Sequence, residues 1–211
     1  TGAALAYLGL LDFWEKAMTT IALLGAAALI SITLGIPLGI YCARRPKAFA
    51  IVRPILDFMQ SMPSFVYLIP VVMLFRVGDF SAMIAIVAYS VVPAIRYTVH
   101  GIQKVDPQLI EAGVVSGCTR RQVLWKIQLP LAMPEIMLGI NQTIMLALSM
   151  LVITALVGTR DLGQEVYIAL TKADTGRGLV AGLSVAFIAI IADRMIAAGV
   201  ARMRRRLGVD A

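Results

Sequence analysis

The residues with the clearest chemical pattern form one polar segment, EAGVVSGCTRRQVLWKIQLP, which runs from residue 111 to residue 130. Glu111 offers a negative charge at its start. Ala112, Gly113, Ser116 and Gly117 are small and recur at helical spacing, so they would let another backbone approach closely. A charge beside a surface of small residues suits recognition of a partner surface.

The sequence around this segment predicts two short helices joined by a sharp turn. Asp106 can cap free backbone amides, and Pro107 suits the first position of a helix. Gly117 suits the left-handed residue that closes a helix, and Thr119 with Gln122 has the form of a capping box. The alternative is a solvated connection whose helices only fill a gap.

Motifs for catalysis, nucleotide binding and metal binding are missing from the sequence. It contains no G-x-x-x-x-G-K-[ST] loop for nucleotide phosphates and no recognisable nucleophile–base pair. Cys42 and Cys118 stand in no C-x-x-C pair, and the one histidine, His100, is too few for a zinc site. We therefore expect no catalytic residue, no metal and no cofactor bound by this chain.

Composition indicates a membrane protein. Of the 211 residues, 60% are hydrophobic and 15% are charged, against about 45–50% and about 25% in soluble domains. A helix needs about 20 residues to cross the hydrocarbon layer. Five apolar stretches are long enough: 19–42, 54–75, 80–99, 131–157 and 179–200. Pro63 and Pro70 interrupt the second stretch and would bend it. The predicted fold is all-α and integral to the membrane, with five transmembrane helices.

The basic residues predict how these spans are oriented. The net charge is +7, and most of the 19 lysines and arginines fall in residues 43–53, 101–130 and 201–211 or at their edges. Such clusters mark cytoplasmic segments, which places the amino end outside and the carboxyl end inside. Residues 1–18 then form a periplasmic, interfacial amphipathic segment with Trp14. Residues 19–200 form the transmembrane domain, with a cytoplasmic loop at 101–130, and residues 201–211 form a basic cytoplasmic tail.

Polar side chains inside the spans are candidates for lining a substrate path, because polar groups are costly in hydrocarbon. The candidates are Gln60, Ser64 and Tyr67 in the second span and Asn141, Ser149 and Thr154 in the fourth. The alternative is that these groups hydrogen-bond between helices.

Asp193 lies near the inner end of the fifth span. We interpret it as a structural partner of Arg194, Arg53 or Arg96, with proton coupling as the alternative.

The spacing of the polar segment resembles a family signature. Glu111-Ala112-Gly113, three residues, Gly117, nine residues and Ile127-x-Leu129-Pro130 resemble the EAA motif of ABC-importer permeases. Four segments resemble the permeases of glycine betaine/proline betaine/choline importers: Leu56–Phe75, Gly117–Gln122, Gly139–Met150 and Leu162–Val166. The chain departs from that family at Glu135, where a small or hydroxylated residue is usual. It also departs at residues 159–161, where the family has a run of small residues.

The resemblance implies the membrane subunit of a type I importer in the bacterial inner membrane. In that family this loop forms a coupling helix that docks into a groove of the ATPase subunit. The residues that carry the match are Glu111, Ala112, Gly113, Gly117, Arg120 and Arg121. The implied partners are a second permease copy, two ATPase subunits that use ATP and Mg²⁺, and an extracytoplasmic solute-binding protein, which residues 159–177 would face. The implied solute is a methylated amine: glycine betaine, choline, proline betaine or trimethylamine N-oxide.

Three rival interpretations remain. A helix-turn-helix with an arginine pair can bind DNA, but spans on both flanks would hold this one against the bilayer, and no recognition face follows. We therefore expect no nucleic-acid partner. A secondary transporter or channel could be driven by ions through Asp57 or Asp193. A permease of the same family for an amino acid such as methionine is the third, which the Gly139–Met150 match disfavours.

Overall fold

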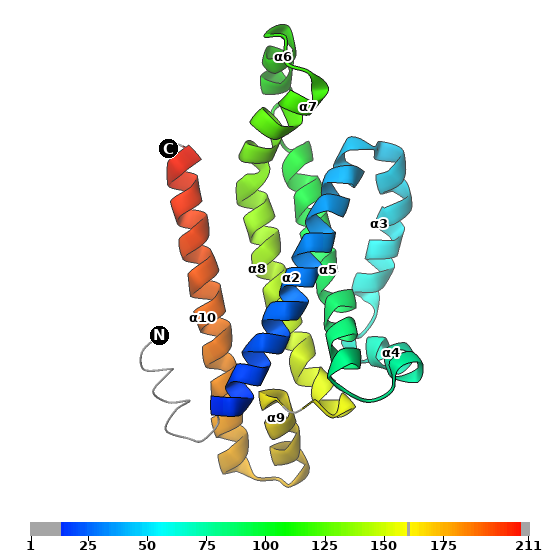
Figure 1. Ribbon diagram of the computed structural model, residues 1–211, viewed down its shortest axis with the longest axis vertical. Helices are drawn as coiled ribbons and strands as arrows, with labels where there is room; N and C mark the ends of the chain where they lie inside the picture. The colour runs from blue at the N-terminus through cyan, green and yellow to red at the C-terminus, as the bar shows by residue number, and fades with distance from the viewer. Residues whose placement is uncertain (1–13, 160, 208–211) are drawn as a thin grey trace.

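The computed structural model describes residues 14–159 and 161–207, and this part of the chain contains helices and no strand. The long helices are α2 (Trp14–Arg44), α5 (Asp79–Gln103), α8 (Leu129–Thr154) and α10 (Thr175–Leu207), which extend along the long axis of the molecule (Figure 1). The shorter elements are α3 (Pro46–Ser61), η1 (Ser64–Tyr67), α4 (Leu68–Phe75), α6 (Pro107–Val115), α7 (Arg120–Val123), η2 (Leu124–Gln128), η3 (Ala155–Val157) and α9 (Leu162–Thr171).

The predicted membrane fold is confirmed. Within the described residues, four helices are long and apolar enough to cross a membrane: Trp14–Arg44, Asp79–Gln103, Arg120–Thr154 and Thr175–Met195. A fifth candidate is a broken pair, Pro46–Ser61 with Ser64–Phe75, whose two parts are bent by 111°. The inside and outside assignment of the loops stays a prediction.

The break in the second predicted span lies at Pro63. Met62 has φ −74° and ψ 134°, which is extended, because a following proline disfavours the helical conformation. Pro70 is the third residue of α4, where the missing N–H would have no partner within the helix. The prediction of a bend at Pro70 is therefore wrong, and the span begins at Pro46 rather than near residue 54.

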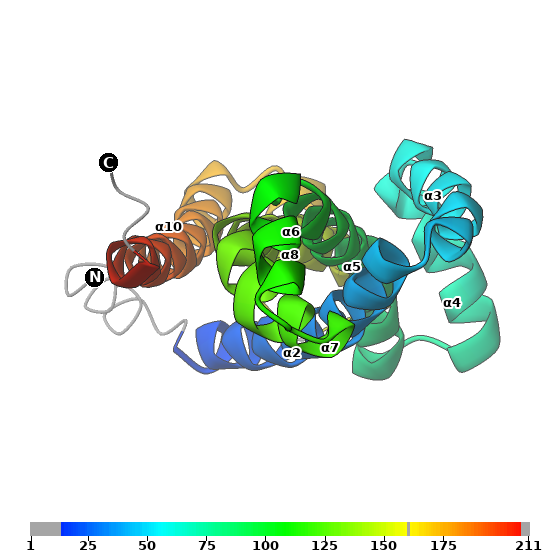
Figure 2. The ribbon, with the colours of Figure 1, turned by 90° about the horizontal axis from the view of Figure 1, so that it is seen from above.

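Helix α5 packs against both α2 and α8 (Figures 1 and 2). A Cβ atom on Gly39 of α2 would lie 2.9 Å from the carbonyl oxygen of Ile95, and one on Gly139 of α8 would lie 2.6 Å from Cβ of Tyr97. Only glycine fits at these two crossings, and small residues of this kind let membrane helices approach closely. Helices α2, α5 and α8 therefore form the packed centre of the protein.

The two ends of the molecule differ. Helices α6 and α7 project beyond the other helices at one end, whereas α4 and α9 lie at the opposite end (Figure 1). Residues 159–177, expected as an outer connection, contain the ten-residue helix α9. Of the predicted interfacial segment 1–18, residues 1–13 lie outside the described residues, and Trp14 begins α2. The predicted tail continues α10 to Leu207.

Candidate functional site

Both ends of α6 are built as the sequence predicts. The side chain of Asp106 accepts a hydrogen bond from the backbone N–H of Gln108 at 2.9 Å. At the other end Gly117 has φ +81°, in the left-handed region that suits glycine. The N–H of Cys118 reaches back to the carbonyl oxygen of Gly113 at 3.0 Å, which satisfies a carbonyl at the helix end. The predicted cap and closing glycine are confirmed.

The second helix of the loop is continuous with a membrane span. It opens with the predicted capping box, in which Thr119 accepts from the N–H of Gln122 and the Gln122 side chain accepts from the N–H of Thr119. Helix α7 then passes through the π-helical turn η2 into α8, so residues 120–154 are helical without interruption. A displacement of α7 is therefore transmitted directly to the span.

Helix α6 is packed onto this continuous rod at one glycine. Gly113 is buried, and a Cβ atom there would lie 2.4 Å from Cδ1 of Ile127 in η2. The contact explains the motif spacing, since Gly113 and Ile127 face each other across the turn. The remaining candidate residues, Glu111, Ala112, Gly117, Arg120 and Arg121, are exposed.

The exposed surface of α6 is partly apolar. Val115 is 89% exposed and Val114 is 56% exposed, on the element that projects furthest from the helical bundle (Figure 1). Hydrophobic residues beside Glu111 on a protruding helix are typical of a surface that a partner protein covers. The loop is thus a rigid projection, attached to α8, with a mixed apolar and charged surface.

Comparison with known proteins identifies the family. Residues 35–205 match the family of binding-protein-dependent transport system inner membrane components. The chain belongs to this family. It is therefore a multi-pass inner-membrane component of a transport system, as predicted.

Two curated relatives of this inner-membrane component illustrate its closeness to named permeases. It is 46% identical over 195 residues to the glycine betaine/proline betaine transport system permease protein ProW of Escherichia coli K12, covering 92% of this chain and 55% of ProW. It is 41% identical over 209 residues to the trimethylamine N-oxide transport system permease protein TmoV of Pelagibacter ubique, covering 99% of this chain and 29% of TmoV. The chain thus spans about half the length of ProW.

Solved structures support the fold. An inward-facing structure of the MetNI methionine ABC transporter contains a chain that matches with a TM-score of 0.80 and 18% identity, covering 90% of this component and 94% of that chain. At this identity the likeness concerns the arrangement of helices only.

The candidate path residues of the second span differ in their exposure. Gln60 is exposed and Ser64 is half-buried, whereas Tyr67 is buried in the core. The Tyr67 hydroxyl donates to the carbonyl oxygen of Met59, and its ring meets the edge of Tyr89 with centroids 5.5 Å apart. Tyr67 therefore packs the bundle.

The candidate path residues of the fourth span separate in the same way. Thr154 is buried, and its hydroxyl donates to the carbonyl oxygen of Leu151 at 2.7 Å. Ser149 is exposed and donates to the carbonyl oxygen of Met145 at 3.0 Å. Of the three candidates in this span, Asn141 is the one that hydrogen-bonds to another span among the described residues. The contacts of Tyr67 and Thr154 fit the interpretation of these groups as structural.

Asn141 is the partner of Asp193. Its side-chain amide donates to the Asp193 carboxylate at 3.3 Å, which joins α8 to α10. The expected pairing of Asp193 with an arginine is wrong among the described side chains, and Arg96 instead pairs with Asp57 of α3. The sequence could not reveal this, because 52 residues separate Asn141 from Asp193.

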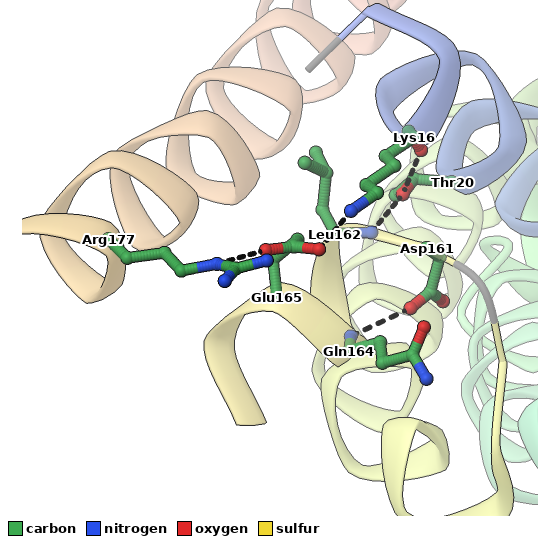
Figure 3. Close-up of polar contacts among 7 residues, drawn as sticks. All are labelled: Lys16, Thr20, Asp161, Leu162, Gln164, Glu165 and Arg177. Atoms are coloured by element: carbon green, nitrogen blue, oxygen red, sulfur yellow. Dashed lines mark hydrogen bonds and ion pairs between the residues drawn. The ribbon is translucent and has the colours of Figure 1, made fainter. Parts of the chain in front are cut away.

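Sequence reasoning also missed a charged cluster around α9 (Figure 3), at the end opposite α6 (Figure 1). Glu165 of α9 is 1% exposed and accepts hydrogen bonds from Lys16 of α2 and from Nε of Arg177 of α10, the latter at 2.6 Å. Beside it the N–H of Leu162 donates to the hydroxyl of Thr20 at 3.0 Å. The cluster therefore fixes α9 to both neighbouring spans.

The pKa values of two acidic residues in this region, Asp161 and Glu165, are shifted in opposite directions. Burial raises the pKa of Asp161 above its ordinary value, although N–H of Gln164 and the Thr159 hydroxyl donate to its carboxylate. Burial also disfavours the charged form of Glu165, but the hydrogen bonds from Arg177 and Lys16 outweigh it, so its pKa is lowered. Arg160, expected to contact a binding protein, lies outside the described residues. No group of three or more potential metal ligands occurs among the described residues.

Proposed function

We propose that this chain is the permease subunit of an ATP-driven importer and that α6 is its coupling helix. The observation that carries the proposal is the contact of Gly113 with Ile127, which attaches α6 to a helix that continues into span α8. A partner protein that binds the exposed surface around Glu111 and Val115 can move α8 through this contact. Rigid-body rocking of the spans then alternates access between the two sides.

The family description, a binding-protein-dependent transport system, supports a binding protein as one partner in the proposed assembly. Two copies of the permease would enclose the path, because the described bundle of one copy fills its own centre with α5. Two ATPase subunits, which use ATP and Mg²⁺, would dock at α6, and a solute-binding protein would dock at the end that holds α9. The chain itself would bind neither ATP nor metal and would not be an enzyme.

The proposed solute is a small methylated amine. The two relatives named above are permeases for glycine betaine and proline betaine and for trimethylamine N-oxide. Each of these compounds has a nitrogen that is methylated, positively charged and without N–H groups, and choline shares this feature. Ion-driven transport through Asp57 is not favoured, because Asp57 forms an ion pair with Arg96.

The test is uptake by the complex reconstituted with its ATPase and binding protein. We expect Gly117→Val to reduce ATP-dependent glycine betaine uptake, because a β-branched residue at φ +81° costs about 1–2 kcal/mol. Gly117→Asn is the matched control, since asparagine tolerates this conformation. Glu111→Lys should reduce uptake by reversing the charge offered to the ATPase. Normal uptake in both Gly117→Val and Glu111→Lys would reject the coupling assignment.

A further inference from the structure

A cluster of basic residues lies at the corner where α2 ends and α3 begins. Arg44, Arg45 and Lys47 are exposed, and none of the ion pairs found among the described side chains involves them. The guanidinium of Arg45 is held in place by Tyr41, 5.2 Å from the ring centroid and with Nη1 donating to the hydroxyl at 3.3 Å. Three uncompensated cations on four consecutive positions form a surface suited to an anion.

The corner is hollowed on both sides of these cations. One hollow of about 370 Å³ is lined by Tyr41, Arg44 and Arg45 and continues along α2 to Pro37 and Ile40. A second hollow of about 500 Å³ shares the same three residues and continues along α3 to Ala48 and Ile51. Each hollow is basic at one end and apolar at the other.

The depth of the first hollow argues for an amphiphile. Pro37 precedes Arg44 by seven residues, which places it about 10 Å further along the helix axis, toward the middle of the span. A free anion would use only the basic end. A phospholipid places its phosphate among the cations and an acyl chain against the apolar wall, so it would use both ends.

The position of the corner selects the type of lipid. It lies at the same end of the molecule as α6 and α7 (Figure 1), which the arginine and lysine distribution predicts to be cytoplasmic. Anionic phospholipids give the cytoplasmic leaflet its negative surface potential, and basic pockets between spans on that side hold such headgroups. The charge of the corner is therefore complementary to the lipid it meets.

We propose that the corner between α2 and α3 is a binding site for an anionic phospholipid. Arg44, Arg45 and Lys47 hold the phosphate, and Tyr41 fixes the orientation of Arg45. The acyl chain lies along Ile40 or Ile51. The site is independent of the coupling loop and of the solute that the protein carries.

The test is lipid binding by the full-length protein in mild detergent, followed by native mass spectrometry during titration with phosphatidylglycerol or phosphatidylcholine. We expect a clear preference for phosphatidylglycerol. The variant Arg44→Gln/Arg45→Gln/Lys47→Gln should lose affinity by about fivefold for each cation removed, on the order of 100-fold in total. The control Arg53→Gln/Lys126→Gln/Arg202→Gln removes three exposed charges outside the hollows and should change affinity by less than about threefold.

Four outcomes would overturn the proposal. These are unchanged phosphatidylglycerol affinity in the triple variant, an equal loss in the control, equal binding of phosphatidylcholine by the wild type, and displacement of the lipid by millimolar inorganic phosphate, which would indicate a free-anion site. Gel filtration of each variant checks folding. If the triple variant does not purify, Arg45→Gln alone should still lower the affinity about fivefold, and an unchanged affinity would count against the site.

Discussion

Gly113 of α6 lies against Ile127 of η2 so closely that a Cβ atom on the glycine would come within 2.4 Å of the isoleucine Cδ1. Two positions that the sequence motif places fourteen residues apart are therefore neighbours in the folded loop. Besides the chain connection itself, this contact joins α6 to the continuous helix formed by α7, η2 and α8.

Gly113→Ala should weaken this contact, and Ile127→Val should restore it. The alanine methyl group would collide with Cδ1, which is the atom that valine lacks. We expect Gly113→Ala to reduce glycine betaine uptake by the reconstituted complex and the double variant to recover most of it. A double-mutant cycle on thermal stability should give a coupling of about 0.5–3 kcal/mol. Additive effects would mean that the two side chains do not communicate.

Gly39→Ala should destabilise the bundle itself. The new methyl group would meet the carbonyl oxygen of Ile95 and the Cβ of Thr98 across the contact of α2 with α5, and neither atom can move away without shifting a helix. We expect a loss of about 1–3 kcal/mol, measured by thermal unfolding in detergent. Gly25→Ala is the control, because nothing lies within 4 Å of a Cβ at that position. A Gly39→Ala protein as stable as this control would contradict the described packing.

Glu165→Gln should destabilise the attachment of α9 to α2 and α10. The change removes the charge that Lys16 and Arg177 share. We expect a cost of about 1–2 kcal/mol, below the value for fully buried charged hydrogen bonds because both cations are partly exposed. The control is Glu15→Gln, an exposed carboxylate at the same end of α2. If Glu165→Gln and Glu15→Gln were equally stable, the result would contradict a structural role for the cluster.

The wild-type protein and Glu165→Gln together test how the contribution of Glu165 to stability depends on pH. The pKa of Glu165 is lowered in the folded state, so its contribution is present above the unfolded pKa and is lost as the pH falls through the folded pKa. Asp161 has a raised pKa and acts in the opposite sense. Both proteins contain Asp161, so its effect cancels in the difference. The difference in the free energy of unfolding between wild type and Glu165→Gln should therefore decrease as the pH is lowered. A difference that does not change with pH would contradict a stabilising role for the charge of Glu165.

Cys118 provides a test of orientation. It lies at the turn after α6 and is half-buried, whereas Cys42 in α2 is fully buried. An impermeant thiol reagent should label Cys118 in inside-out vesicles and not in right-side-out vesicles, if the basic connections are cytoplasmic. Cys118→Ser should abolish the labelling, because Cys42 is not accessible. Labelling of Cys118 in right-side-out vesicles would contradict the proposed topology.

Local features of the loop could be predicted because their causes act over a few residues. Asp106 caps α6 through an amide two residues away, the Thr119–Gln122 box closes within one turn, and Gly117 takes the positive φ that its lack of a Cβ allows. The membrane spans could be predicted because length and apolar composition are sufficient to cross hydrocarbon. The position of the break at Pro63 followed from covalent geometry. The bend predicted at Pro70 is absent because this proline lies in the first turn of α4, where a backbone N–H would have no partner within the helix.

What the tertiary structure alone decided is which helix faces meet. Lys16 and Glu165 are 149 residues apart, and the sequence around each residue does not indicate that they form an ion pair. Asp193 accepts a hydrogen bond from Asn141 rather than from an arginine, because the packing of α10 on α8 places that amide within reach. Ile127 meets Gly113 for the same kind of reason. Composition and spacing determine each helix, but partner choice depends on the close packing of side chains across interfaces, which only the folded chain defines.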